Sequence, residues 1–86
     1  MSKTITVYSQ SYCPYCAAAD ALLKRKGVEF EVIDLGNEPA RREEMLERSQ
    51  GARTVPQIFI GDQHIGGFDD MNALDKKGEL DSLLGN

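Results

Sequence analysis

The chain has 86 residues, ten basic and fourteen acidic side chains, and a net charge of −4, a size that predicts one domain over residues 1–86. The acidic balance argues against a nucleic-acid binder, and no apolar run approaches the roughly 18 residues that a membrane span requires. Two cysteines and no signal-peptide pattern argue against a disulfide-stapled secreted fold, so we expect a cytoplasmic protein.

The first part of the chain is predicted to form a β-α-β unit. Residues 4–8 alternate apolar and polar side chains and are rich in β-branched types, which indicates a strand. Pro14 suits the first turn of a helix that runs to about Lys26, and Gly27 ends it. Residues 29–35 indicate a second strand, and the helix between the two strands implies a parallel crossover.

The rest of the chain is predicted to hold a helix, a hairpin and two more helices. The helix begins at Pro39 and runs to about Ser49, and the hairpin joins residues 57–60 to residues 63–65. Asp69 or Asp70 caps a third helix that ends near Lys77, and a short helix follows at 79–84. We interpret the charged residues of the second helix as a solvated face: Arg41, Arg42, Glu43, Glu44, Glu47 and Arg48.

Cys13 and Cys16 stand at the predicted junction of the first strand and the first helix. Free amides and the helix dipole stabilise a thiolate at the cap position, and the second cysteine lies almost one turn further on, where we expect a more buried thiol. This placement indicates a redox pair rather than two structural thiols, with Tyr8 and Tyr12 flanking it. A zinc site needs four ligands, whereas the chain offers these cysteines and His64, an expected exposed hairpin residue, so we expect no metal.

Three segments in this order give the chain a resemblance to the glutaredoxins, most closely to the small bacterial dithiol glutaredoxins of the glutaredoxin 3 type. They are Cys13-Pro14-Tyr15-Cys16, then Thr54-Val55-Pro56 before the third strand, then Gly66-Gly67-Phe68-Asp69-Asp70. The resemblance covers essentially the whole chain and implies an α/β thioredoxin fold. In that fold a four-stranded mixed sheet of order 2-1-3-4 is flanked by three to four helices.

The resemblance also implies an activity, that of a glutathione-dependent thiol-disulfide oxidoreductase. Such an enzyme reduces protein disulfides and protein–glutathione mixed disulfides, with glutathione as co-substrate and no permanently bound cofactor. Cys13 is then the nucleophile and Cys16 the resolving thiol. The implied glutathione-binding residues are Gln10, Tyr15, Arg53, Thr54, Val55, Pro56, Gly67, Phe68, Asp69 and Asp70.

Several of these residues carry a specific role in the resemblance. Pro56 is similar to the family's cis-proline, and Val55 would pair its backbone with the cysteinyl part of glutathione. Amides at the start of the third helix suit the γ-glutamyl carboxylate. Asp70 would contact the γ-glutamyl ammonium while Asp69 caps the helix, unless both aspartates merely cap it.

Two positions depart from the family pattern. Gln10 stands where the family usually has a lysine that contacts the glycyl carboxylate, and Arg53 and Gln57 are candidates to replace it. Phe68 stands where close relatives carry a further cysteine, so regulatory oxidation is ruled out at this position. We expect Phe68 either to shield the bound tripeptide or to pack on the core.

Two alternatives stay open at this stage. One is a glutaredoxin-like protein reduced by thioredoxin reductase, which only Gln10 favours. The other is an iron–sulfur cluster carrier in which two chains share a cluster through Cys13 and two glutathiones, which Pro14 and Tyr15 disfavour. We expect a monomer whose partners are glutathione and disulfide-containing or glutathionylated proteins, ribonucleotide reductase being one family possibility, with no nucleic-acid or membrane partner.

Overall fold

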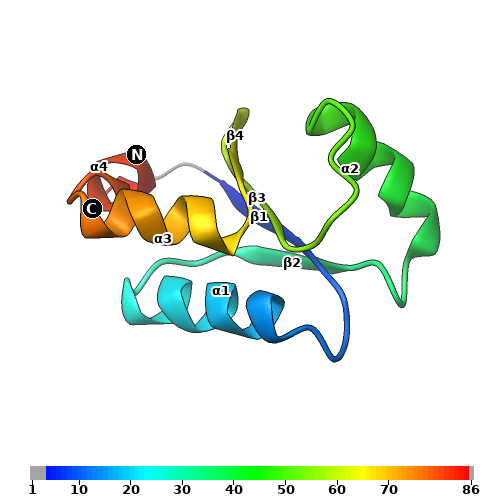
Figure 1. Ribbon diagram of the computed structural model, residues 1–86, viewed down its shortest axis with the longest axis horizontal. Coiled ribbons are helices and arrows are strands. Elements are labelled where there is room, and N and C mark those ends of the chain that lie inside the picture. Colours follow the sequence, from blue (N-terminus) through cyan, green and yellow to red (C-terminus); the bar gives the residue numbers. More distant parts are fainter. Residues whose placement is uncertain (1–3, 86) are drawn as a thin grey trace.

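A computed structural model describes residues 4–85 and shows a four-stranded sheet of order β2-β1-β3-β4 (Figure 1). The central strand β1 (Ile5–Ser9) pairs in parallel with β2 (Glu31–Asp34) and antiparallel with β3 (Gln57–Ile60). The edge strand β4 (Gln63–Gly66) pairs antiparallel with β3. The predicted strand order and mixture of directions are confirmed.

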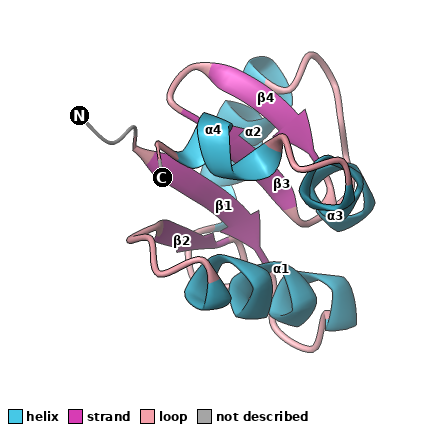
Figure 2. Cartoon of the chain, turned by 90° about the vertical axis from the view of Figure 1, so that its left-hand side faces the viewer, coloured by secondary structure: helices cyan, strands magenta, loops and turns pink. Residues whose placement is uncertain are grey.

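Helices cover both faces of this sheet. The helices α1 (Pro14–Arg25) and α3 (Phe68–Lys76) pack side by side on one face, where α4 (Leu80–Leu84) joins them (Figures 1 and 2). On the other face lies α2 (Arg42–Arg48), preceded by the 3₁₀ turn η1 (Pro39–Arg41). The single helix predicted from Pro39 is therefore two short elements. Across residues 4–85, none of the helices has the length and apolar character needed to cross a bilayer.

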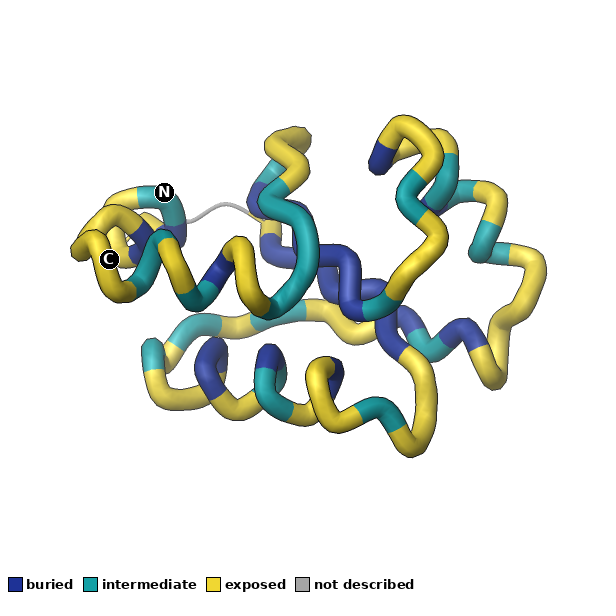
Figure 3. The backbone as a smooth tube through the Cα atoms, viewed as in Figure 1, coloured by how far each residue is buried: buried dark blue, intermediate teal, exposed yellow. Residues whose placement is uncertain are grey.

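Two apolar clusters hold the layers together, one on each face of the sheet. The larger contains Ile5 and Val7 of β1 with side chains of α1, α3 and α4, and the smaller contains Tyr8 with Met45 of α2 and Phe59 of β3. Successive residues of a strand point to opposite faces, so one short strand serves both clusters. Figure 3 shows β1 and β3 buried along their whole length.

Tyr8 does not flank the cysteines as expected, because its side chain points to the α2 face and is fully buried. Its hydroxyl donates a hydrogen bond to Glu44 and accepts one from Nη1 of Arg48 at 2.9 Å. Arg41 pairs with Glu44 at 3.0 Å, and this bond lowers the pKa of the Glu44 carboxyl. The prediction of a solvated face holds for Glu43 and Glu47, which are exposed, whereas Glu44 and Arg48 bond to the buried phenol.

Replacing Tyr8 with phenylalanine should lower the free energy of unfolding by about 1–2 kcal/mol, because Glu44 and Arg48 lose their shared partner. Urea denaturation followed by circular dichroism measures the change. Tyr12→Phe is the matched control, since the Tyr12 side chain is fully exposed and its hydroxyl is not part of the network. Equal stability of Tyr8→Phe and the parent chain would show that the network does not stabilise the fold.

Candidate active site

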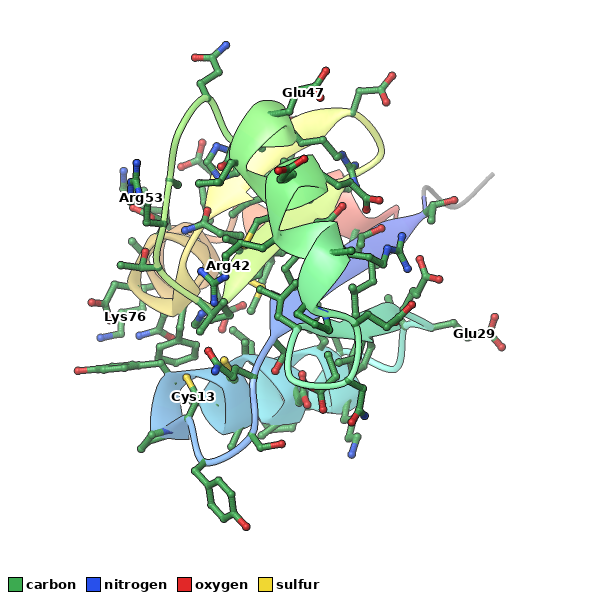
Figure 4. The ribbon with its side chains drawn as sticks, turned by 90° about the vertical axis from the view of Figure 1, so that its right-hand side faces the viewer. Cys13, Glu29, Arg42, Glu47, Arg53 and Lys76 are labelled. Carbon is green, nitrogen blue, oxygen red and sulfur yellow. The ribbon has the colours of Figure 1, made fainter. Side chains whose placement is uncertain are left out.

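The two cysteines lie at the start of α1, where the sequence placed them. Cys13 is the N-cap residue in an extended backbone conformation, and its Sγ accepts a hydrogen bond from the amide of Cys16 at 3.2 Å. Pro14 follows as the first helical residue, and both thiols are free. Cys13, labelled in Figure 4, is half-buried at the surface. Cys16 is 3% exposed. The predicted difference in burial between the two thiols is confirmed.

Their surroundings give the two thiols different chemistry. The Cys16 amide donates a hydrogen bond to the Cys13 sulfur, which stands at the N-terminal end of α1 and is open to a substrate. Burial raises the pKa of Cys16, and its hydrogen bond with Cys13 raises it further, while bonds with Ser9 and the Gln10 backbone act in the opposite direction. Cys16 is therefore held as a neutral thiol beside a reactive partner.

The loop before β3 lies against Cys13. The Val55–Pro56 peptide bond is cis, as the family pattern implies, and the Cys13 thiol is 3.9 Å from the Val55 carbonyl oxygen. Gln57 supports the loop, because its amide donates to the Thr54 carbonyl at 3.0 Å and to the Thr54 hydroxyl at 3.2 Å. The backbone beside Pro56 is thus presented next to the nucleophile.

A groove of about 470 Å³ runs from this loop to the start of α3. Its volume falls in the usual range for small-molecule sites. Most of the residues that the sequence assigned to glutathione line it: Tyr15, Thr54, Val55, Pro56, Gly67, Phe68, Asp69 and Asp70. The structure therefore brings together segments that are more than fifty residues apart in the chain.

Gln10 and Arg53 lie outside the lining of this groove. Gln10 lines a second groove with Cys13, while Arg53 is exposed on the loop, where Nη1 of Arg42 donates to its carbonyl at 3.3 Å. Figure 4 shows Arg53 projecting from the loop above Cys13, with Arg42 beside that loop. The sequence did not indicate that Arg42 supports the loop that carries Arg53, because only the packing of α2 brings this arginine to the loop.

Gln57, a candidate to replace the missing lysine, lines the groove, but its amide donors are already used. Its side chain is 4% exposed, and its two amide hydrogens are already bonded to Thr54. Its Oε1 lies 2.6 Å from Nε2 of His64, whose ring stacks on Phe59 with centroids 4.8 Å apart. His64 is exposed on the hairpin, as expected, and it also supports the loop through its contact with Gln57. The register that pairs it with Phe59 is the signal that could have indicated this role.

At the start of α3 the cap comes from Asp70 rather than Asp69. The Asp70 carboxylate accepts a hydrogen bond from the Gly67 amide at 3.0 Å, and Asp69 is exposed. Gly66 has φ +115°, and any side chain there would collide with Asp70, so glycine is required. Phe68 packs against the core, which confirms one of the two expectations, and it also lines the groove with Tyr15, whose ring centroid lies 6.5 Å from its own. Within residues 4–85, no group of three or more His, Cys, Asp or Glu side chains is arranged to hold a metal ion.

Comparisons with known proteins agree with this geometry. A family model described as Glutaredoxin matches residues 5–65. A probable glutaredoxin of Synechocystis sp. is 54% identical over 84 residues, covering 98% of this chain and 96% of the relative. Glutaredoxin 3 of Escherichia coli (strain K12) is 54% identical over 80 residues, covering 93% and 95%. The buckwheat glutaredoxin–glutathione complex superimposes with a TM-score of 0.86 at 31% identity, covering 96% of this chain and 77% of that chain.

Proposed function

The chain belongs to the glutaredoxin family and is a thiol-disulfide oxidoreductase, and from this premise we propose that glutathione is its reductant. Its substrates in this proposal are protein disulfides and protein–glutathione mixed disulfides. The observation that carries the proposal is the position of Cys13, whose sulfur touches the wall of a groove of tripeptide size. The similar buckwheat protein was solved as a complex with glutathione.

In this proposal the groove and the exposed loop beside it together offer a partner for each part of glutathione. The Val55 backbone beside Pro56 pairs with the cysteinyl residue as one rung of a ladder, so that the glutathione sulfur faces Cys13. Amides in the first turn of α3 suit the γ-glutamyl carboxylate, and the carboxylates of Asp69 and Asp70 suit its ammonium group. Arg53 supplies positive charge near the glycyl end.

Removal of glutathione from a protein uses Cys13 alone. Its thiolate attacks the glutathionyl sulfur, the bond to the protein sulfur breaks, and the protein cysteine leaves as a thiolate that takes up a proton. A second glutathione thiolate then attacks the glutathionyl sulfur on Cys13. Oxidised glutathione departs and the Cys13 thiolate is restored, so each turnover consumes one free glutathione, which pairs with the glutathionyl group taken from the substrate.

Reduction of a protein disulfide uses both cysteines. Cys13 attacks one sulfur of the substrate, and the other sulfur leaves as a thiolate. Cys16 then loses its proton and attacks the Cys13 sulfur, which releases the reduced protein and forms a Cys13–Cys16 disulfide. Two glutathione molecules reduce that disulfide in turn. The buried position of Cys16 next to Cys13 suits this second step.

The test of the proposal is the choice of reductant. A glutathione mixed disulfide should be turned over with glutathione and glutathione reductase, and turnover should be far slower with thioredoxin reductase in their place. The opposite preference would overturn the proposal. Anaerobic reconstitution with iron and sulfide should yield no visible absorbance from an iron–sulfur cluster.

We further propose that the chain works as a single-domain monomer in the cytoplasm, where thiols are kept reduced.

Arg53→Met should raise the KM for glutathione about threefold to tenfold and leave kcat nearly unchanged, because an exposed charge contributes to ground-state binding. The coupled glutathione reductase assay measures both constants. Arg25→Met, an equal change of charge in the last turn of α1, is the control. A contradicting result is an unchanged KM in Arg53→Met together with a much lower KM in Gln10→Lys.

A further inference from the structure

A second groove, which shares no lining residue with the proposed glutathione groove, opens beside Cys13. It measures about 520 Å³, and the residues lining it include Gln10, Tyr12, Cys13, Cys16 and Asp20. Cys13 lines this second groove, while its sulfur also lies 3.9 Å from the Val55 carbonyl of the first. The nucleophile is therefore next to both grooves, and in the proposed function glutathione occupies only the first of them.

Asp20 gives the second groove a negative charge. It lies on α1 four residues after Cys16, so the two side chains share one face of the helix. Among the described residues that line the groove, Asp20 carries the one charged side chain. Its Oδ1 is buried and has no hydrogen-bond partner within residues 4–85. Burial raises the pKa of this carboxyl, and the nearby charge of Lys24 lowers it.

Tyr12 gives the same groove an aromatic rim. Its side chain is fully exposed, and its backbone has φ +60°, a left-handed conformation that bulky residues rarely adopt. The residue therefore holds a large apolar ring in solvent immediately before the nucleophile. Strained backbone and exposed aromatic rings are both typical of contact surfaces.

We propose that the second groove binds the polypeptide of a disulfide substrate next to its reactive cysteine, and that Asp20 selects a basic side chain there. This inference rests on the proposed function. When a substrate cysteine is joined to Cys13, its chain extends in two directions. One side can pair with Val55 in the first groove, and the other side then runs over Tyr12 toward Asp20. The preferred substrates are disulfide proteins with lysine or arginine close to the attacked cysteine.

Two cyclic peptide disulfides that differ only in a lysine or glutamate beside each cysteine test this inference. We expect kcat/KM to be about threefold to fivefold higher for the lysine peptide, the effect of one partly exposed ion pair. In Asp20→Asn the preference should disappear. Asp62→Asn, an equal change of charge in the turn between β3 and β4, should keep it. Added salt should weaken the preference in the parent chain.

Tyr12→Ala provides a variant whose folding is not in question, because the replaced ring has no packing contacts to lose. It should lower kcat/KM for both peptides and leave turnover of hydroxyethyl–glutathione disulfide unchanged, since that substrate is too small to reach the rim. Equal rates for the two peptides in the parent chain, or a preference that survives in Asp20→Asn, would overturn the inference. A chain that fails on hydroxyethyl–glutathione disulfide itself would instead refute the proposed function.

Discussion

A Cys13→Ser variant should turn over neither a protein–glutathione mixed disulfide nor a protein disulfide. Both reactions begin with attack by the Cys13 sulfur, and a serine oxygen can neither ionise at neutral pH nor form a disulfide. The loss should be about 10⁴-fold or more, as for removal of other nucleophiles. The coupled assay with glutathione and glutathione reductase measures it for both substrates.

Two control measurements check that the fold and the groove remain intact in Cys13→Ser. Cys13 is half-buried and lies outside both apolar clusters, so the midpoint of urea unfolding should barely move. Glutathione added to Cys13→Ser should still shift the amide resonances of Val55 and Gly67, because these groups do not depend on the thiol. Retention of a tenth of the parent activity would mean that another thiol starts the reaction.

The fold was largely predictable because its signals are local. Strand alternation, Pro14 at a helix start and glycines at the helix ends each depend on a few neighbouring residues. The position of the Tyr8 side chain is a feature that these local signals do not predict. All five residues of β1 are buried, so the strand pattern does not say which face carries the functional groove. The partner of the Tyr8 hydroxyl, Glu44, lies 36 residues further along the chain.

The parts of the candidate site that could be predicted are those where the residue type and its place in the chain already indicate the chemistry. Two cysteines at a helix start indicate redox chemistry without any knowledge of the sheet. Gln57 and Asp20 behave differently, because their roles depend on burial. Gln57 is held between Thr54 and His64, which no spacing in the sequence reveals. Asp20 and Lys24 have the spacing of an exposed helical ion pair, yet the fold buries one Asp20 oxygen without a hydrogen-bond partner within residues 4–85.

A Cys16→Ser variant should separate the two reactions that Cys13→Ser removes together. Turnover of a protein–glutathione mixed disulfide should stay within about twofold of the parent rate, because only Cys13 and glutathione take part. Reduction of a protein disulfide should fall about 100-fold or more, because nothing resolves the bond between Cys13 and the substrate. Mass spectrometry should then detect the trapped mixed disulfide on Cys13.

The pH dependence of the two reactions gives a second test of the role of Cys16. Burial raises the pKa of Cys16, so below that pKa its thiolate fraction grows about tenfold for each unit of pH. Where the Cys16 step limits the rate, reduction of protein disulfides by the parent chain should therefore accelerate as the pH rises. The first attack of Cys16→Ser on the glutathione mixed disulfide, followed in a single turnover without free glutathione, should lack this Cys16-dependent increase, since neither a Cys16 proton nor a free glutathione thiol is involved.

Cys16→Ala distinguishes lost chemistry from damaged packing. Cys16 is 3% exposed, so serine places a hydroxyl where a sulfur was buried, whereas alanine adds no polar group. Both variants should lose protein disulfide reduction and keep turnover of the glutathione mixed disulfide. If both variants lost the two activities equally while remaining folded, Cys16 would be needed for the first attack. The division of labour between a half-buried nucleophile and a buried resolving thiol would then be wrong.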